Sequence, residues 1–290
     1  MATFKGVITA MVTPFTADGE VDLPGCRRVA RFLIENGSDA LVLAGTTGES
    51  PTLEDEEKLA ILRAVREELG GETQLIVGTG SNDTRHSVRA TRDATEAGAD
   101  AVLIVTPYYN RPNPAGVRAH FEACCAATDR PVVAYNIPSR CVINIPVDDL
   151  AEMAASFPNL TAVKQANDDE LGPIDGLEVL AGNDNVFLRA LEIGGTGGIT
   201  VASHIVGPEM HDIAEAHARG EAERARRLDA ELQEIYEVMG VTTNPIPVKT
   251  ALEMLGICSA TMRLPMVPAT DSQRDTIRTA LERRGLEVVA

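Results

Sequence analysis

The chain has 290 residues, 44% of them hydrophobic, which is enough for one α/β barrel with an appendage or for two ordinary domains. Its formal net charge of −17 would repel phosphate backbones and anionic lipids, so nucleic-acid and membrane-surface roles are disfavoured. The five cysteines lack CxxC spacing, and no apolar run has the length of a membrane span. We therefore expect a soluble protein of the reducing cytoplasm.

Short apolar runs alternate along the chain with amphipathic stretches. The apolar runs predict eight strands: Val7–Thr13, Ala40–Ala44, Leu75–Gly78, Ala101–Thr106, Val132–Asn136, Thr161–Lys164, Glu178–Ala181 and Gly198–Ala202. Between them, apolar residues recur at spacings of three and four, as Leu59, Leu62, Val65 and Leu69 do. This spacing predicts intervening helices, among them Leu53–Leu69, Asp83–Ala97 and Pro114–Thr128.

Eight strands that each precede a helix predict an α/β fold of the (β/α)₈ TIM-barrel type. The alternative is a doubly wound open sheet, which would need fewer strands. Beyond about residue 220 no strand pattern returns, and three further helices are predicted: Glu221–Met239, Pro247–Leu255 and Asp271–Arg284. We therefore predict a catalytic barrel over residues 1–224 and a C-terminal helical domain over residues 225–290.

Lys164 lies at the end of the sixth predicted strand and is one of only four lysines in the chain. A charged amine in a strand buried on both faces is costly unless it is paired or has a function. Desolvation would lower its pKa and leave a nucleophilic free amine, the group that forms Schiff bases. The alternative is a lysine that reaches the rim of the barrel or pairs with a structural carboxylate.

Hydroxyl side chains gather at the ends of other predicted strands, where the active sites of parallel barrels lie. Thr46 and Thr47 belong to the loop Gly45–Ser50, whose glycines would let backbone N–H groups approach a small carboxylate. Tyr108–Tyr109 and Tyr135 end the fourth and fifth strands. Phenols at such positions can shuttle protons, or they can simply pack at a wet interface.

Two further patterns give no support for a phosphate or metal site. The glycine-rich run Gly194–Gly198 precedes the eighth strand, so we interpret it as a tight turn at the end of the barrel opposite the site. The histidines show no ligand spacing such as HExxH; they are His86, His120, His204, His211 and His217. We therefore expect neither a metal nor a cofactor, and a metal-dependent aldolase is disfavoured.

Five ordered motifs carry a resemblance to the dihydrodipicolinate synthase / N-acetylneuraminate lyase superfamily, and they span almost the whole chain. They are Gly45–Glu49 (GTTGE), Thr106–Pro112 (TPYYNRP), Tyr135–Arg140 (YNIPSR), Lys164, and Asn244–Lys249 (NPIPVK). The resemblance implies a barrel with a C-terminal helical domain. It also implies a class I aldolase-type lyase that binds pyruvate as a Schiff base.

The resemblance also assigns roles to individual residues. Lys164 would condense with pyruvate, and Tyr135 would be the general acid and base. Thr46 would relay protons to Tyr135, and Thr47 would bind the pyruvate carboxylate. Tyr109 would complete the relay from a neighbouring subunit, which implies at least a dimer. The superfamily is usually a homotetramer, a dimer of dimers.

Arg140 indicates the second substrate. The form Tyr-Asn-x-Pro-Ser-Arg resembles the superfamily members that bind the carboxylate of aspartate semialdehyde, and a guanidinium fork suits that anion. Gly182 and Ile199 are also predicted to contact substrate. The alternatives are a 2-keto-3-deoxy sugar acid aldolase or N-acetylneuraminate lyase with the same imine chemistry, and a catalytically silent binding barrel.

Two positions depart from the superfamily pattern. Gln165 follows the lysine where relatives more often have Glu, so a nearby negative charge is missing. Lysine-inhibited relatives carry His and Glu at the positions that match Lys58 and His86. Because basic side chains repel an effector ammonium, we predict weak or absent inhibition by lysine.

Overall fold

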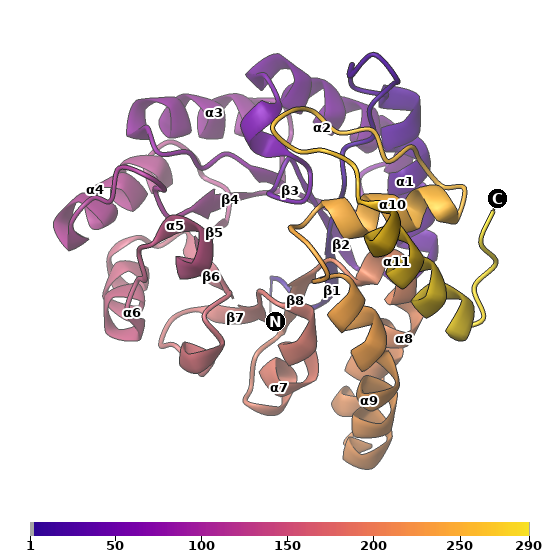
Figure 1. Cartoon of the computed structure of the whole chain (residues 1–290). Helices are drawn as coiled ribbons and strands as arrows, with labels where there is room; N and C mark the ends of the chain where they lie inside the picture. The colour runs from indigo at the N-terminus through magenta and orange to yellow at the C-terminus, as the bar shows by residue number, and fades with distance from the viewer. Residues whose placement is uncertain (1–2, 290) are drawn as a thin grey trace.

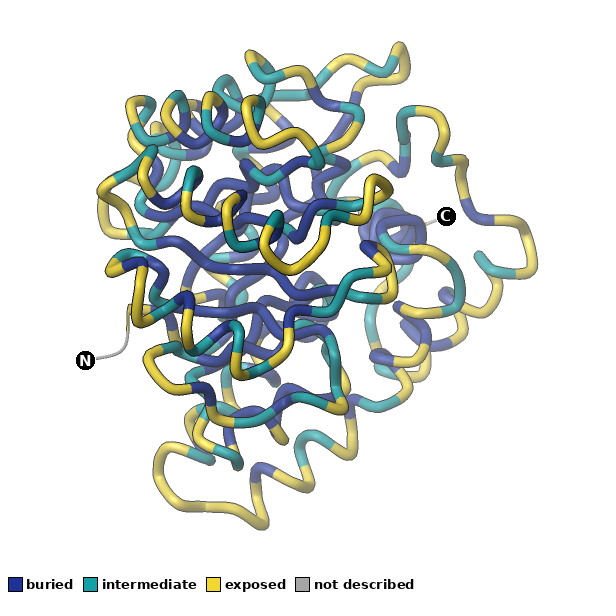
Figure 2. Tube along the Cα trace, turned by 90° about the vertical axis from the view of Figure 1, so that its left-hand side faces the viewer, coloured by how far each residue is buried: buried dark blue, intermediate teal, exposed yellow. Residues whose placement is uncertain are grey.

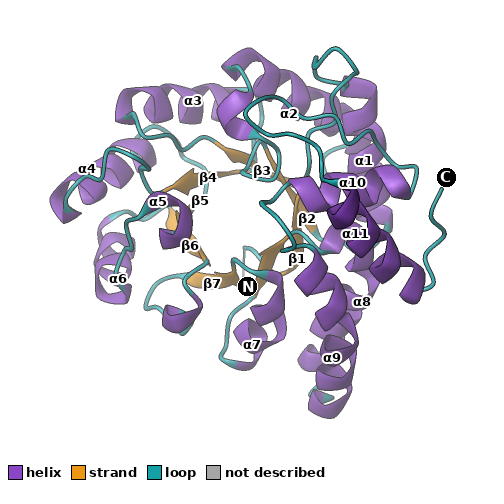
Figure 3. Ribbon diagram, viewed as in Figure 1, coloured by secondary structure: helices purple, strands orange, loops and turns teal. Residues whose placement is uncertain are grey.

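The computed structural model describes residues 3–289 and contains a closed barrel of eight parallel strands, seen as a ring in Figure 3. The first strand pairs with both the second and the last, so the predicted TIM barrel is confirmed and an open sheet is excluded. The ends of the two predicted domains, residues 1–2 and 290, lie outside the described residues. The strands are β1 (Gly6–Ala10), β2 (Ala40–Leu43), β3 (Gln74–Gly78), β4 (Ala101–Val105), β5 (Val132–Asn136), β6 (Leu160–Gln165), β7 (Glu178–Ala181) and β8 (Gly197–Thr200).

Helices surround this ring on the outside, and the last three gather on one side of it (Figure 1). The predicted helices are present, with ends that differ from the prediction by a few residues. The helices are α1 (Leu23–Glu35), α2 (Asp55–Leu69), α3 (Thr84–Glu96), α4 (Pro114–Cys125), α5 (Pro138–Cys141), α6 (Val147–Ser156), α7 (Phe187–Glu192), α8 (Ser203–Ala218), α9 (Ala222–Val238), α10 (Ile246–Met254) and α11 (Asp271–Arg283). The first three residues of the glycine-rich run, 194–196, form the turn between α7 and β8, and Gly197 and Gly198 begin the strand itself.

Local side-chain contacts explain where several helices begin. The Asp83 carboxylate accepts a hydrogen bond from the Arg85 N–H at the start of α3. Helix α4 begins at Pro114, whose fixed φ suits a first helical position, and Asn113 caps it. These contacts involve neighbours in the sequence, which is why the sequence alone predicted these starts.

Alternate residues of each strand face the barrel interior and the surrounding helices. On β2, Val42 belongs to the interior cluster, whereas Leu41 belongs to the cluster beneath the helices. On β6, Ala162 faces the interior and Val163 faces outward. Figure 2 shows the strands as a buried centre within a partly exposed shell. This period of two places every second side chain of β6 inside the barrel.

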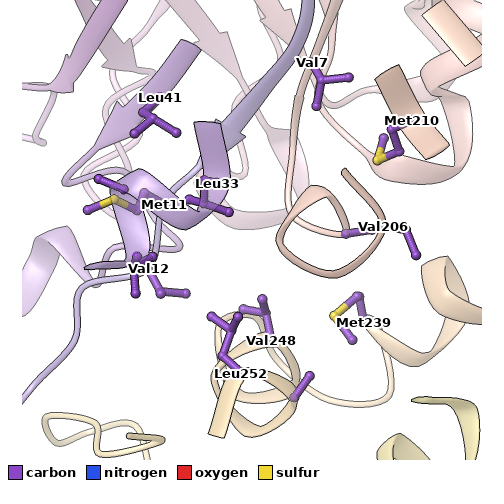
Figure 4. Packing of buried hydrophobic residues seen from close by; sticks show 14 of the residues in the cluster. Val7, Met11, Val12, Leu33, Leu41, Val206, Met210, Met239, Val248 and Leu252 are labelled. Atoms are coloured by element: carbon purple, nitrogen blue, oxygen red, sulfur yellow. The ribbon is translucent and has the colours of Figure 1, made fainter. Parts of the chain in front are cut away.

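The C-terminal helices share a hydrophobic core with the barrel. Val248 and Leu252 of α10 belong to one buried cluster with Met11, which follows β1, and Val206 of α8. Figure 4 shows these side chains together with Met239, which follows α9. Burial of a valine or leucine contributes roughly 1.5–3 kcal/mol, so this packing holds α10 firmly against the barrel.

Candidate active site

Lys164 and Tyr135 lie side by side within the barrel. They are directly paired on the neighbouring strands β6 and β5. Each lies two residues from an interior residue of its own strand and therefore faces the barrel interior as well. Both side chains are buried, with 5% exposure each. The Lys164 Nζ lies 4.4 Å from the centroid of the Tyr135 ring. The amine therefore points into the barrel interior next to the phenol and away from bulk solvent.

The surroundings of Lys164 favour its neutral form. Burial lowers the pKa of Lys164 from 10.5 to about 8, because desolvation penalises the charged ammonium. This net value also includes the Asp184 carboxylate, which raises the pKa of Lys164, and Arg140, which lowers it by like-charge repulsion. With a pKa near 8, roughly one tenth of the amine would be unprotonated at pH 7, which makes it an available nucleophile.

Tyr135 remains protonated at any physiological pH. Burial raises the pKa of Tyr135 to about 12, although Arg140 and a hydrogen bond with the Thr46 side chain act in the opposite direction. A neutral phenol both donates and accepts hydrogen bonds. Tyr135 and Thr46 can therefore pass a proton along a hydroxyl chain next to Lys164, without a phenolate having to form in the resting enzyme.

The loop after β2 presents Thr46 and Thr47 at the mouth of the barrel. It closes on itself through hydrogen bonds from the Glu49 N–H to the Thr46 carbonyl, 3.1 Å, and from Ser50 N–H to Gly45 carbonyl, 3.2 Å. The Thr47 hydroxyl accepts a 3.0 Å hydrogen bond from the Asn244 Nδ2. The remaining donor capacity of this hydroxyl can serve a carboxylate.

Six of the eight predicted site residues line one cavity of about 320 Å³: Lys164, Tyr135, Thr46, Thr47, Arg140 and Gly182. Arg140 is exposed at its edge and donates a 3.2 Å hydrogen bond to the Asn244 carbonyl. A Cβ at Gly182 would lie 2.6 Å from the Ala166 Cβ and 2.7 Å from the Gln165 carbonyl oxygen. Only glycine fits at this position next to Gln165 and Ala166. Gly182 therefore leaves space in the cavity and lines it with backbone atoms.

The structure does not bring the other two predicted residues to this cavity. Ile199 of β8 is fully buried and packs in the barrel interior cluster that also contains Tyr135. Tyr109 lies on the surface with 89% exposure, and its φ of 71° is uncommon for a residue other than glycine. A large exposed aromatic side chain held in a strained backbone conformation is typical of a residue that acts on something outside its own chain.

Among the cavity residues that the sequence did not predict, two contact or influence the predicted ones. Asp184 is a partly buried carboxylate, and its oxygens accept N–H groups of Val201 and Ala202 at 2.8 and 2.9 Å. Asn244 connects Thr47 to Arg140 through the two hydrogen bonds described above. Asp184 follows the end of β7, a position that could have indicated it, whereas only the motif around Asn244 pointed to that residue.

Lys58 and His86, two basic side chains that depart from the superfamily pattern, lie next to a carboxylate. The His86 Nε2 lies 2.9 Å from the Asp55 carboxylate, and the Lys58 Nζ lies 3.6 Å from it. Arg89 is a third basic neighbour, at 3.8 Å. The Asp55 carboxylate therefore already has cationic partners, which leaves little negative charge for an added ammonium group.

Residues 3–289 show no group of three or more His, Cys, Asp or Glu side chains that could hold a metal ion. His204 and His120 are buried, and desolvation lowers the pKa of each to about 4, so both are neutral. No helix in this described range is both long and apolar enough to cross a bilayer. The polar groups that line the cavity are an amine, hydroxyls, a guanidinium, a carboxylate and amides.

A buried amine beside a phenol at the carboxyl ends of barrel strands defines the class of lysine-dependent, Schiff-base aldolase-type barrels. The sequence model of the dihydrodipicolinate synthetase family matches residues 3–284, and the chain belongs to this family. It is 43% identical to the 4-hydroxy-tetrahydrodipicolinate synthase of Moorella thermoacetica, over 97% of this chain and 98% of the relative. The Bacillus subtilis enzyme of the same name is 40% identical, over 96% and 98% of the two chains. The crystal structure of dihydrodipicolinate synthase from Aquifex aeolicus superimposes with a TM-score of 0.95 at 36% identity and covers 99% of this chain and 100% of its own.

Proposed function

We propose that this chain has 4-hydroxy-tetrahydrodipicolinate synthase activity and condenses pyruvate with aspartate 4-semialdehyde, a step toward lysine and diaminopimelate. The observation that carries the proposal is the buried amine of Lys164, which lies 4.4 Å from the Tyr135 ring and has a pKa of about 8. The family and its synthase relatives, at 40–43% identity over nearly the full length, support the substrate pair. The sugar-acid alternative is not favoured.

The residues of the cavity supply each step of the reaction. The neutral amine of Lys164 attacks the keto carbon of pyruvate, and the carbinolamine loses water to give an imine. Tyr135 and Thr46 carry the protons that this addition and dehydration require. Loss of a methyl proton to the Tyr135–Thr46 hydroxyl chain gives an enamine, whose carbon attacks the aldehyde of the second substrate. The amino group of that substrate then displaces the Lys164 amine from the imine carbon, which closes the ring and frees the lysine. Thr47 binds the pyruvate carboxylate.

Arg140 selects the second substrate in this proposal. Its guanidinium lies at the exposed edge of the cavity, where it can bind the carboxylate of the semialdehyde with two hydrogen bonds. Gly182 borders the bound substrates, and Ile199 acts from the barrel interior beneath them. Arg140→Ala should weaken semialdehyde binding, while the imine with pyruvate should still form on Lys164.

The proposed active unit contains at least two copies of the chain, because Tyr109 is exposed and does not line the cavity of its own chain. It would complete the proton relay of a neighbouring copy, in a dimer or a dimer of dimers. We also propose that the barrel, residues 1–224, and the C-terminal helices, residues 225–290, are the two units of the chain. The expected location is the cytoplasm, in keeping with five free cysteines.

Borohydride reduction in the presence of pyruvate tests the imine, because it converts the imine into a stable adduct that mass spectrometry locates on a single lysine. We expect that adduct on Lys164, and none on the Lys164→Ala variant. A condensation assay with aspartate semialdehyde then tests the substrate pair. An enzyme that forms the adduct but cleaves keto-deoxy sugar acids faster than it condenses the semialdehyde would contradict the substrate assignment.

A further inference from the structure

Lys249, on α10, is fully buried, and its ammonium group has three hydrogen-bond acceptors. They are the Glu49 Oε1 at 2.7 Å, the Thr13 carbonyl at 2.9 Å and the Thr261 carbonyl at 2.6 Å. The ammonium also lies 4.4 Å from the Phe15 ring centroid. One buried cation thus joins the segment after β1, the loop after β2 and the segment after α10.

Glu49 places this contact at the base of the loop that carries Thr46 and Thr47. Its φ of 57° is a left-handed conformation, uncommon for a residue with a side chain. The Glu49 N–H closes the turn onto the Thr46 carbonyl, and its other carboxylate oxygen accepts the Arg263 N–H at 3.2 Å. The strained residue is therefore held by its side chain as well as by its backbone.

The same short segment of the chain holds this loop at two points. Asn244 binds the Thr47 hydroxyl at one end of the segment, and Lys249 binds Glu49 at the other. A third contact, from the Thr13 hydroxyl to the Gly48 carbonyl at 2.7 Å, comes from the segment after β1 that Lys249 also binds. The position of the two threonine hydroxyls thus depends on residues about 200 positions away in the sequence.

Resting on the proposed function, we propose that the buried Lys249–Glu49 ion pair is a positioning device for the pyruvate-binding loop. It acts through Glu49 and touches no substrate. A loop that lost this anchor would still contain Thr46 and Thr47, but the hydroxyls would no longer be fixed for the carboxylate and the proton relay. Small displacements of positioned groups cost large factors in rate.

Glu49→Gln tests this inference, because it removes the charge and keeps the shape. The amide N–H₂ of glutamine would then face another donor, either the Lys249 ammonium or the Arg263 N–H, and could not bond to it. Lys249 would still bind its two carbonyl partners. We expect the KM for pyruvate to rise at least about tenfold and borohydride trapping to slow, while the KM for aspartate semialdehyde changes less than about twofold. A merely structural role would lower the amount of active enzyme and leave both KM values unchanged.

Glu57→Gln is the matched control. Glu57 pairs with the Arg263 guanidinium at 2.7 Å. The change therefore removes another ion pair between the C-terminal part of the chain and the barrel, at a residue outside the pyruvate-binding loop. We expect its KM for pyruvate to match the wild type. The double variant Glu49→Gln/Lys249→Met removes both buried charges, and should melt at a higher temperature than Lys249→Met while keeping the raised KM for pyruvate.

The outcomes separate this inference from the proposed function. If the wild type forms the pyruvate adduct but Glu49→Gln keeps the wild-type KM for pyruvate, the positioning role is wrong and the function stands. A double variant with a wild-type KM for pyruvate would overturn the inference in the same way. If the wild type forms no adduct on Lys164, both the inference and the proposed function fail.

Discussion

The rate of imine formation should follow the titration of the Lys164 amine. The pKa of Lys164 is lowered from 10.5 to about 8, mainly by desolvation, so the ammonium is destabilised relative to the neutral amine by on the order of 3 kcal/mol compared with water. At pH 7 this raises the neutral fraction from roughly 0.03% to roughly 10%. Since only the neutral amine attacks pyruvate, the rate should increase as pH rises through the folded-state pKa.

The assay is the second-order rate constant of borohydride-trapped adduct formation, measured with subsaturating pyruvate from pH 6 to pH 10. We expect the rate to rise about tenfold per pH unit below pH 8 and to be constant above about pH 9. Tyr135, whose pKa is about 12, does not titrate in this range. The Lys164→Ala variant gives the background. A rate that still rises tenfold between pH 9 and pH 10 would mean an unperturbed amine and would refute the reasoning.

Three further results are expected. Asp184→Asn should move the midpoint of that pH profile to lower pH, because the carboxylate stabilises the Lys164 ammonium; an unchanged midpoint would contradict this. Tyr109→Phe alone should lose most activity. Coexpressed with Lys164→Ala, it should give more activity than the two variants do separately, because one site of a mixed dimer then has both the lysine and the tyrosine. Activity equal to the sum of the two would rule out a contribution of Tyr109 to a neighbouring copy. Millimolar lysine should inhibit the wild type little, and Lys58→His/His86→Glu should increase inhibition; strong inhibition of the wild type would refute the charge argument.

Gln165 shows how strand parity limits the effect of a departure from the family pattern. Its side chain lies on the face of β6 opposite Lys164, where its Oε1 accepts hydrogen bonds from the Asn136 Nδ2 at 3.0 Å and the Asn167 N–H at 3.2 Å. The sequence showed that Gln165 lacks the negative charge of its counterparts, but it did not show which face of the strand carries the side chain. The structure places this residue in a polar network outside the barrel interior, so the departure does not remove a partner of the amine.

The sequence by itself determined the barrel and the place of Lys164 at the carboxyl end of the sixth strand, and the structure then showed that its side chain faces the interior. Alternating burial along β6 follows from the period of two in a strand, and parallel strands bring their carboxyl ends to one mouth. Helix starts such as that at Pro114 were also readable, because their caps are contacts between neighbours in sequence. The resemblance to the family then supplied the roles proposed for Tyr135 and Thr46.

Only the tertiary structure decided which distant groups tune that site. The carboxylate of Asp184 near Lys164, the Asn244 contact with Thr47 and the ion pair of Lys249 with Glu49 join separate parts of the chain. Such contacts leave no local periodicity or spacing, because they depend on how the closed barrel and its C-terminal helices pack together. The physical reason is that burial and partner identity set a side chain's charge and position, and both are properties of the folded chain.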